Sequence, residues 1–413
     1  MATIRPFAGI RPAPQYAKEV AALPYDVMNT EEAREMVQGK PYSFLHIDRA
    51  EIDLPQGTDP YSPEVYAQAA NTFARQKAEG IFIQDTQPCF YIYHLTMGER
   101  AQTGLVVCTS IDEYLNNTIK KHELTRAEKE ADRIRHVDTL NANTGPIFLA
   151  YRQKPEIAEI IKEQTKQAPL YDFCAEDGIG HTVWQITDQT IIDALVKQFA
   201  AVPALYIADG HHRNASAVKV GLKRREAHPD YTGNEEFNYY LSVLFPAEEL
   251  FILDYNRVVK DLNGRDAETF LKEVAQSFVI TPAAESPCHP PKRHTFGMYL
   301  TGKWYLLEAK PEIVSSDAVD GLDVAILQNA LLAPILGIGD PRTDKRIDFV
   351  GGIRGLEELE RRVDSGEMQV AFSMFPTAME ELMAVADDDR TMPPKSTWFE
   401  PKLRSGLFIH DLG

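Results

Sequence analysis

The chain joins a short apolar run to a polar, glycine-containing turn in the segment Ala204-Leu205-Tyr206-Ile207-Ala208-Asp209-Gly210-His211-His212-Arg213. The apolar run Ala204–Ile207 predicts a short buried strand that ends at Asp209-Gly210. We expect a helix to follow, from about His211 to Arg225. This strand–turn–helix junction is the best candidate in the chain for chemistry.

Helices and strands alternate on both sides of the junction. Upstream of it, hydrophobic periodicity predicts helices over residues 63–79, 156–167 and 189–199, and strands over 90–95, 104–110, 147–151 and 182–186. Downstream, it predicts strands over 239–244, 250–253, 295–299, 304–308 and 369–373, and helices over 267–277 and 321–332. This mixture predicts an α+β (mixed α/β) fold.

A chain of 413 residues is too long for one ordinary hydrophobic core, so we expect two compact units. We place the boundary at the turn Lys260–Gly264. Residues 1–260 are then a catalytic-type α/β domain that carries the junction, and residues 261–413 are a second α/β unit packed on it.

The formal net charge of −18 at pH 7 repels polyanions on average, so we expect no nucleic-acid partner. A local basic pocket for a small phosphate compound remains compatible with that charge. The four cysteines are scattered without a CxxC pair, which is typical of reduced thiols in the cytosol.

The N-terminus lacks the apolar stretch of a signal peptide. The most hydrophobic long window, Val319–Ile338, is broken by aspartates and a proline, which indicates a core helix and not a membrane span. We therefore expect a cytoplasmic protein without a membrane partner, and the sequence leaves a homodimer open.

The residues Asp209 to Arg213 suit the binding of a phosphate. Free backbone N–H groups and the positive dipole at a helix start attract anions, and Gly210 lets a ligand approach the backbone closely. Arg213 would grip a phosphate with its planar fork, and His211 or His212 would donate to it or transfer a proton. Asp209 would hold Mg²⁺ or accept a hydroxyl proton. The alternative is a capped turn with surface histidines.

A second group of basic residues lies upstream. Thr125 and Glu128 form a capping-box pattern for a helix on which Arg126 and Arg133, seven residues apart, share one face. A basic face beside an anion site would bind phosphate, whereas the alternative is a solvated, salt-bridged surface.

A third candidate lies near the C-terminus, where Lys395, Ser396 and Thr397 combine one cation with two hydroxyl groups. They would donate to a phosphate, or they belong to a strand that anchors the tail.

The chain contains no Walker sequence and no convincing GxGxxG, so a nucleotide would bind through a different fold from the P-loop enzymes. HExxH is absent too, and adjacent histidines are unsuited to ligating one zinc ion together. Mg²⁺ held by carboxylates and substrate phosphates is the expected metal.

The segment Asp209–Arg213 resembles the signature of the ParB/sulfiredoxin superfamily, in which a strand enters a glycine-containing motif that ends in arginine and precedes a helix. That motif contributes to nucleotide or phosphate binding. Its form here is similar to that of free-serine kinases, which phosphorylate L-serine. The resemblance implies a ParB/sulfiredoxin-like core with added strands and helices, ATP or ADP with Mg²⁺, and a small polar substrate.

Such kinases use an upstream glutamate as catalytic base, and Glu123 is the best positional match. The alternative for Glu123 is an exposed charge at a helix N-terminus.

Over nearly its whole length the chain also resembles the domain-of-unknown-function 1015 family. The resembling segments are Arg5–Phe7, Pro24–Val27, Pro41–His46, His122–Arg126, Asn141–Pro146 and Pro393–Thr397. This resemblance implies no function.

Three hypotheses therefore stand on the sequence. The first is a nucleotide-dependent kinase of free L-serine or a similar hydroxy compound. The second is a phosphatase or nucleotide hydrolase that uses the same phosphate pocket, and the third is a nucleotide-binding regulatory protein of ParB type.

Overall fold

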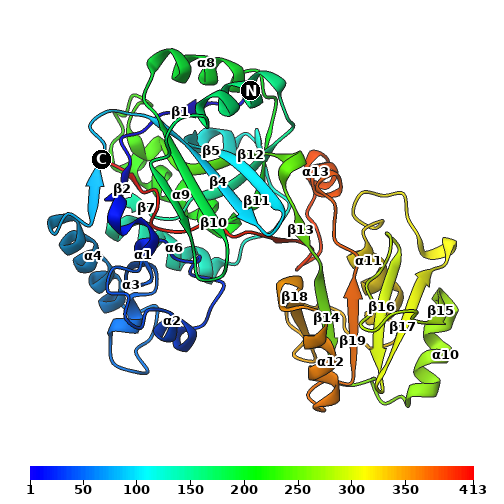
Figure 1. Cartoon of the computed structure of the whole chain (residues 1–413). Coiled ribbons are helices and arrows are strands. Elements are labelled where there is room, and N and C mark those ends of the chain that lie inside the picture. Colours follow the sequence, from blue (N-terminus) through cyan, green and yellow to red (C-terminus); the bar gives the residue numbers. More distant parts are fainter. The chain divides into compact units, whose positions relative to one another are not determined.

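The computed structural model describes residues 1–413 and divides them into two compact units (Figure 1). The first unit comprises Met1–Leu250 together with Pro401–Gly413, and the second comprises Phe251–Glu400. Helices and sheets occur in both units, so the predicted mixed α/β class is confirmed. None of the helices has the length and apolar character needed to cross a membrane.

A nine-stranded mixed sheet forms the centre of the first unit. Its strands are β1 (Ile4–Arg5), β4 (Phe90–Met97), β5 (Arg100–Ser110), β6 (Ile119–Lys120), β8 (Ile147–Tyr151), β9 (Tyr171–Cys174), β10 (Gly180–Ile186), β11 (Leu205–Asp209) and β12 (Tyr239–Pro246). They follow the order β6-β11-β8-β12-β5-β4-β10-β9, and β1 pairs with β5. The pairs β6–β11 and β8–β12 are parallel, and all others are antiparallel.

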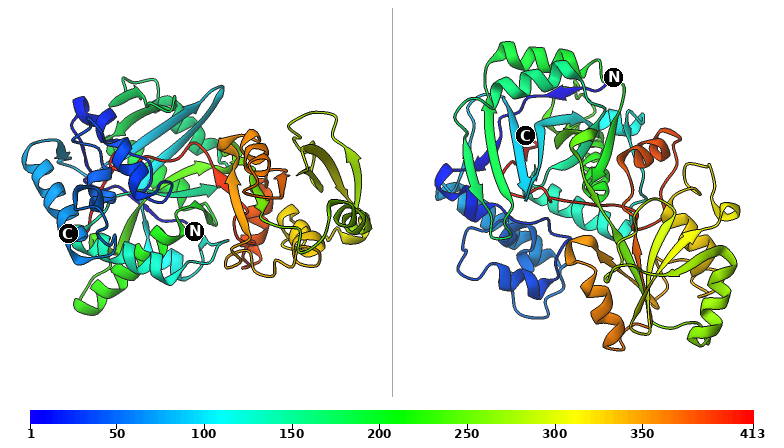
Figure 2. Two further views of the ribbon diagram at one scale, coloured as in Figure 1. Left: turned by 90° about the horizontal axis from the view of Figure 1, so that it is seen from below. Right: turned by 45° about the vertical axis from the view of Figure 1, so that its right-hand side comes forward.

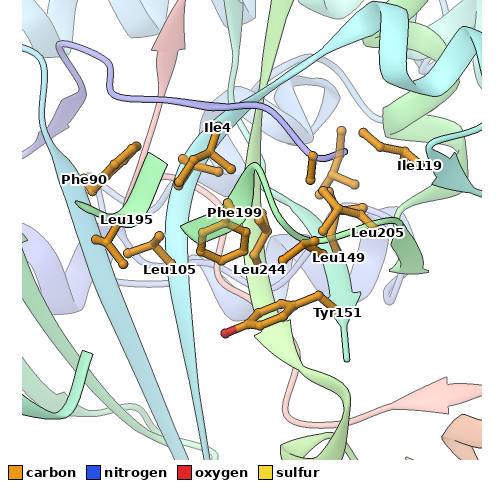
Figure 3. Close-up of a cluster of buried hydrophobic side chains, with 14 of the residues drawn as sticks. Ile4, Phe90, Leu105, Ile119, Leu149, Tyr151, Leu195, Phe199, Leu205 and Leu244 are labelled. Carbon is orange, nitrogen blue, oxygen red and sulfur yellow. The ribbon is translucent and has the colours of Figure 1, made fainter. Parts of the chain in front are cut away.

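Nine helices belong to this unit. They are α1 (Ala17–Val20), α2 (Thr30–Met36), α3 (Leu45–Asp48), α4 (Pro63–Ala78), α5 (Ile111–Leu115), α6 (Ala127–Leu140), α7 (Pro155–Gln164), α8 (Gln189–Phe199) and α9 (His211–Ala227). Apolar side chains of α7 and α8 pack on alternate residues of the sheet. Figure 3 shows Leu195 and Phe199 of α8 beside Leu105, Leu149 and Leu205 of the strands. This core fixes β11, and with it the start of α9.

The last 13 residues return to the first unit as an extended strap, Pro401–Gly413. Within it, β21 (His410–Asp411) pairs with β7 (Ala142–Asn143), and Ile409 forms a bridge with Ile10. Both chain termini therefore lie in the first unit (Figure 2). We expected the tail to belong to the second unit, and its short strand pairing gave no periodic signal.

The second unit is built on an antiparallel six-stranded sheet in the order β15-β17-β16-β19-β14-β18. These strands are β14 (Tyr255–Val259), β15 (Phe278–Pro282), β16 (Thr295–Leu300), β17 (Lys303–Ala309), β18 (Ile347–Gly351) and β19 (Val370–Met374). Its helices are α10 (Ala267–Ser277), α11 (Asp323–Leu327), α12 (Glu357–Asp364) and α13 (Met379–Asp387). A short pair, β13 (Ile252–Leu253) with β20 (Trp398–Phe399), joins the two ends of the unit. The turn at residues 260–264 thus lies inside this unit, because β14 before it already pairs in the second sheet.

Candidate functional site

The site is organised by the turn between β11 and α9. Gly210 has a φ of +92°, a left-handed conformation that residues with a Cβ rarely adopt. A Cβ at this position would also lie 3.2 Å from Nε of Arg213. The turn therefore requires glycine at position 210 for two reasons: the left-handed backbone, and the close approach of the Arg213 guanidinium group.

Asp209 is held by the turn and by the C-terminal strap. Its Oδ1 accepts the N–H of Gly210 at 2.8 Å, and its Oδ2 accepts from Nζ of Lys402 at 3.2 Å. Burial raises the pKa of Asp209, but the positive charges of Lys402 and Arg213 outweigh it and hold that pKa well below its usual range. The carboxylate is thus ionised and engaged, which favours a role in positioning Lys402.

His211 connects the turn to the segment that contains Glu123. Its Nδ1 lies 3.9 Å from Oε2 of Glu123, and its Nε2 accepts a long bond of 3.5 Å from the backbone N–H of His122. His211 is buried, whereas half of the Glu123 side chain is exposed. The structure therefore brings together two predicted catalytic residues that are 88 positions apart in the chain.

His212 contacts the start of α6, where its Nε2 accepts the backbone N–H of Arg126 at 3.0 Å. This bond caps α6 from outside, so the predicted capping box is wrong: the N-cap is Arg126, without a side-chain cap. The hydroxyl of Thr125 donates instead to Glu130, at 2.9 Å. The tertiary contact from α9 replaces the local one.

Arg213 reaches across to the segment Asn141–Pro146. Its Nη1 donates to the carbonyl of Pro146 at 2.8 Å, while its buried Nε has no hydrogen-bond partner. The guanidinium group lines a small cavity of about 30 Å³, which Tyr25, Thr144 and Arg133 also line. The buried Nε–H of Arg213 therefore lacks a partner within the protein.

Arg133 lines both this cavity and a larger one of about 300 Å³. It is buried, donates to Asp132 at 2.9 Å and stacks on the ring of Tyr25 at 3.9 Å. Arg126, in contrast, is exposed at the helix start. The two arginines therefore lie in different environments, and a phosphate role for either of them stays a prediction.

Both charge signs line the larger cavity. Its charged residues are Asp48, Arg49, Glu51, Lys129, Asp132 and Arg133, and Tyr25, Tyr61, Tyr66 and His136 add rings to the walls. Several of these charges pair with each other, as Arg49 does with Glu51 at 2.9 Å. The cavity has the polar lining and the size of a pocket for a small polar compound.

The third predicted group, Lys395 to Thr397, lies in the second unit and contacts other residues of that unit. Nζ of Lys395 lies 5.4 Å from the ring centre of Tyr255, and its carbonyl accepts from Arg257 at 3.0 Å. The hydroxyl of Ser396 donates to the carbonyl of Pro393 at 2.6 Å. Thr397 directly precedes β20. These contacts anchor the end of the second unit, and a phosphate role for the three residues stays a prediction.

Sequence reasoning missed Lys402, which lies 193 positions from Asp209. Lys402 belongs to no recognisable motif, and it reaches the site only because the strap Pro401–Gly413 folds back onto the first unit. The lining residues Tyr25 and Asp48 were missed as well, although Tyr25 belongs to a segment that carries the family resemblance.

Three segments of that resemblance meet here: His122–Arg126, Asn141–Pro146 and Pro24–Val27. Residues 4–325 match the family described as "Protein of unknown function (DUF1015)". The chain belongs to this family. A comparison with curated proteins finds no match.

Solved structures with a similar arrangement include a free serine kinase in complex with AMP, at 13% identity and a TM-score of 0.37, which covers 75% of this DUF1015 chain and 91% of that one. A conserved hypothetical protein from Pyrococcus furiosus has 15% identity and a TM-score of 0.36, covering 73% and 94%. SbnI with a C-terminal truncation, from Staphylococcus aureus, has 11% identity and a TM-score of 0.38, covering 73% and 85%.

Proposed function

We propose that this protein is a nucleotide-dependent phosphotransferase acting on a small hydroxy compound, with free L-serine as the leading acceptor. The observation that carries the proposal is the meeting of Glu123 with the Asp209–Arg213 turn, at 3.9 Å between Glu123 and His211. A carboxylate that can orient an alcohol and a turn that can hold a phosphate then share one place in the first unit.

The turn has the groups that an anion needs. Gly210 leaves the backbone open, the first N–H groups of α9 have no partner within the helix, and the helix dipole favours negative charge there. Lys402 and Arg213 carry two positive charges that offset the negative charges of Asp209 and Glu123, so the turn has no net negative charge to repel a phosphate. A terminal phosphate of ATP or ADP suits this position.

Glu123 suits the task of a base. Its side chain is half exposed, so a substrate hydroxyl group can approach it. A general base must come within hydrogen-bond distance of the proton that it takes, directly or through one water. Phosphoryl transfer depends mainly on positioning and charge neutralisation, so one carboxylate and a few cations are enough protein machinery.

The larger cavity shares Tyr25, Asp48 and Arg133 with the small cavity beside Arg213, and its lining offers carboxylates and cations together. Neither Glu123 nor the turn lines it, so the acceptor is assigned to the exposed side of Glu123 and not to this cavity. Mg²⁺ would be held largely by the nucleotide phosphates, because this ion retains several waters and needs few protein ligands.

A phosphate-transfer assay tests the proposal. The full chain is incubated with Mg²⁺, ATP or ADP, and a panel of hydroxy amino acids, and products are separated by mass. We expect phosphoserine from the wild type, and a loss of about 100-fold or more in Arg213→Ala, comparable to the loss of one electrostatic contact in other enzymes. Arg224→Ala is the matched control, because Arg224 lies at the far end of the same helix and binds Asn141 and Asp138.

Inorganic phosphate released without transfer to any acceptor would replace the kinase by the hydrolase alternative. Equal activity in Arg213→Ala and Arg224→Ala would reject the turn as the phosphate site.

A further inference from the structure

Two buried histidines and a half-exposed glutamate cluster beside the start of α9. His122, Glu123 and His211 each offer one ligand atom, and these atoms lie within 4.8 Å of one another. The two imidazole rings are nearly perpendicular, at 87°, with centroids 4.4 Å apart. Two nitrogens and one carboxylate oxygen are a common ligand set for transition metals in proteins.

The ring of His122 supplies an independent observation. His122 is only 2% exposed, yet neither of its ring nitrogens has a hydrogen-bond partner. Burying a polar group without a partner costs free energy, so such a ring indicates a ligand that completes its contacts. The carbonyl of Ile207 lies beside the ring and can orient one of its nitrogens when the other is bound to a ligand.

We propose that His122, Glu123 and His211 bind one divalent transition-metal ion. Imidazole nitrogens favour Zn²⁺, Co²⁺ or Fe²⁺ over the oxygen-preferring Mg²⁺, Ca²⁺ and Mn²⁺. Ligand atoms around a tetrahedral zinc lie roughly 3.3 Å apart, given bonds of about 2.0–2.1 Å. The cluster therefore needs a closure of up to about 1.5 Å between ligand atoms, a shift of the size that side-chain rotation gives.

The exposed side of Glu123 gives the ion an entry path and leaves a coordination position for water or another small ligand. His212 takes no part, because its Nε2 accepts the N–H of Arg126. The inference goes beyond phosphate transfer, since it concerns binding that can be measured without turnover.

A cobalt titration tests the site. The full chain is stripped with a chelator and titrated with Co²⁺, whose visible absorption reports nitrogen and oxygen ligation. A second stripped sample is loaded with Zn²⁺, and the bound Zn²⁺ is counted by elemental mass spectrometry. We expect one equivalent of metal per chain. Glu123→Gln and His211→Gln should weaken the binding by about 10- to 100-fold or more, since losing a ligand costs at least as much as losing its outer-shell partner.

His181→Gln is the matched control, because His181 is a buried histidine of the same unit whose ring nitrogens contact Tyr93 and Arg404, outside the cluster. Glu123 is half exposed, so Glu123→Gln should leave the fold intact and a loss of metal binding in this variant cannot be attributed to misfolding. Less than a tenth of an equivalent bound to the wild type, or equal binding by Glu123→Gln and the wild type, would overturn the inference. Nucleotide binding measured on the same samples separates this failure from a failure of the proposed function.

Discussion

Replacing Lys402 with methionine should destabilise the first unit, because it removes the cation that faces Asp209. Methionine keeps the length of the apolar stem, so the change removes the charge with little loss of packing. Asp209 would keep the N–H of Gly210 and lose the ammonium group at 3.2 Å. The strap would also lose a polar attachment to the turn.

The geometry sets the size of the effect. At 3.2 Å the attraction is about 5 kcal/mol with an effective dielectric constant of about 20, before the cost of desolvation. Breaking a buried pair costs about 3–5 kcal/mol, whereas an exposed pair contributes about 0–1 kcal/mol. Because 30% of the Asp209 side chain and 11% of the Lys402 side chain are exposed, we expect a loss of about 2–3 kcal/mol at pH 7.

The same pair predicts the pH dependence. The folded state lowers the pKa of Asp209 below its unfolded value of about 3.9, so the unfolded state binds more protons in acid. This contribution to stability is complete above about pH 5 and is lost as the pH falls through about 4 and lower. The difference between wild type and Lys402→Met should therefore shrink at pH 3.

Hydrogen exchange along a urea titration measures this effect unit by unit, with peptides from β8, β11 and α9 as reporters. Lys223→Met is the control, since Lys223 pairs with Asp138 but is 63% exposed, and it should change the unfolding free energy by less than about 0.5 kcal/mol. An equally small change for Lys402→Met, or a difference that does not shrink at all between pH 7 and pH 3, would refute the reasoning.

Three further predictions concern the same unit. Gly210→Ala should cost about 1–3 kcal/mol, because alanine is strained at a φ of +92° and its Cβ would press on Arg213; a melting temperature equal to the wild type's would contradict this. His212→Ala should cost about 1 kcal/mol and speed the exchange of the amide at the start of α6, which loses its acceptor, whereas unchanged protection would show that the bond is unimportant. Burial lowers the pKa of both His122 and His136 to about 4, so the melting temperature should fall between about pH 6.5 and pH 4, and less steeply in His136→Gln than in the wild type; parallel curves would count against it.

Local signals predicted much of the fold. The helix expected over residues 189–199 is α8, and the strand and helix around Asp209-Gly210 are β11 and α9 within two residues at each end. These elements have clear apolar periodicity and a glycine at the turn, so neighbouring residues alone specify them. Two-residue strands such as β6 and β21 carry no such periodicity, and only their partners in the fold define them.

The site residues that belong to one contiguous motif could be predicted from the sequence to lie together. Gly210, His211 and Arg213 come together because they occupy one turn. The link between Glu123 and His211 needed a resemblance, and Lys402 had no signal at all, because the C-terminal strap that delivers it follows 150 residues of another unit.

The affinity of the chain for ADP tests the central claim most directly, because it requires no knowledge of the acceptor. Isothermal titration calorimetry compares the wild type, Arg213→Ala and Arg224→Ala in the presence of Mg²⁺. The account predicts that Arg213→Ala weakens ADP binding by about 10-fold or more, as expected for a lost charge-assisted bond of about 1.5–3 kcal/mol, while Arg224→Ala binds like the wild type. Equal affinities in all three proteins, or no ADP binding by the wild type, would contradict it.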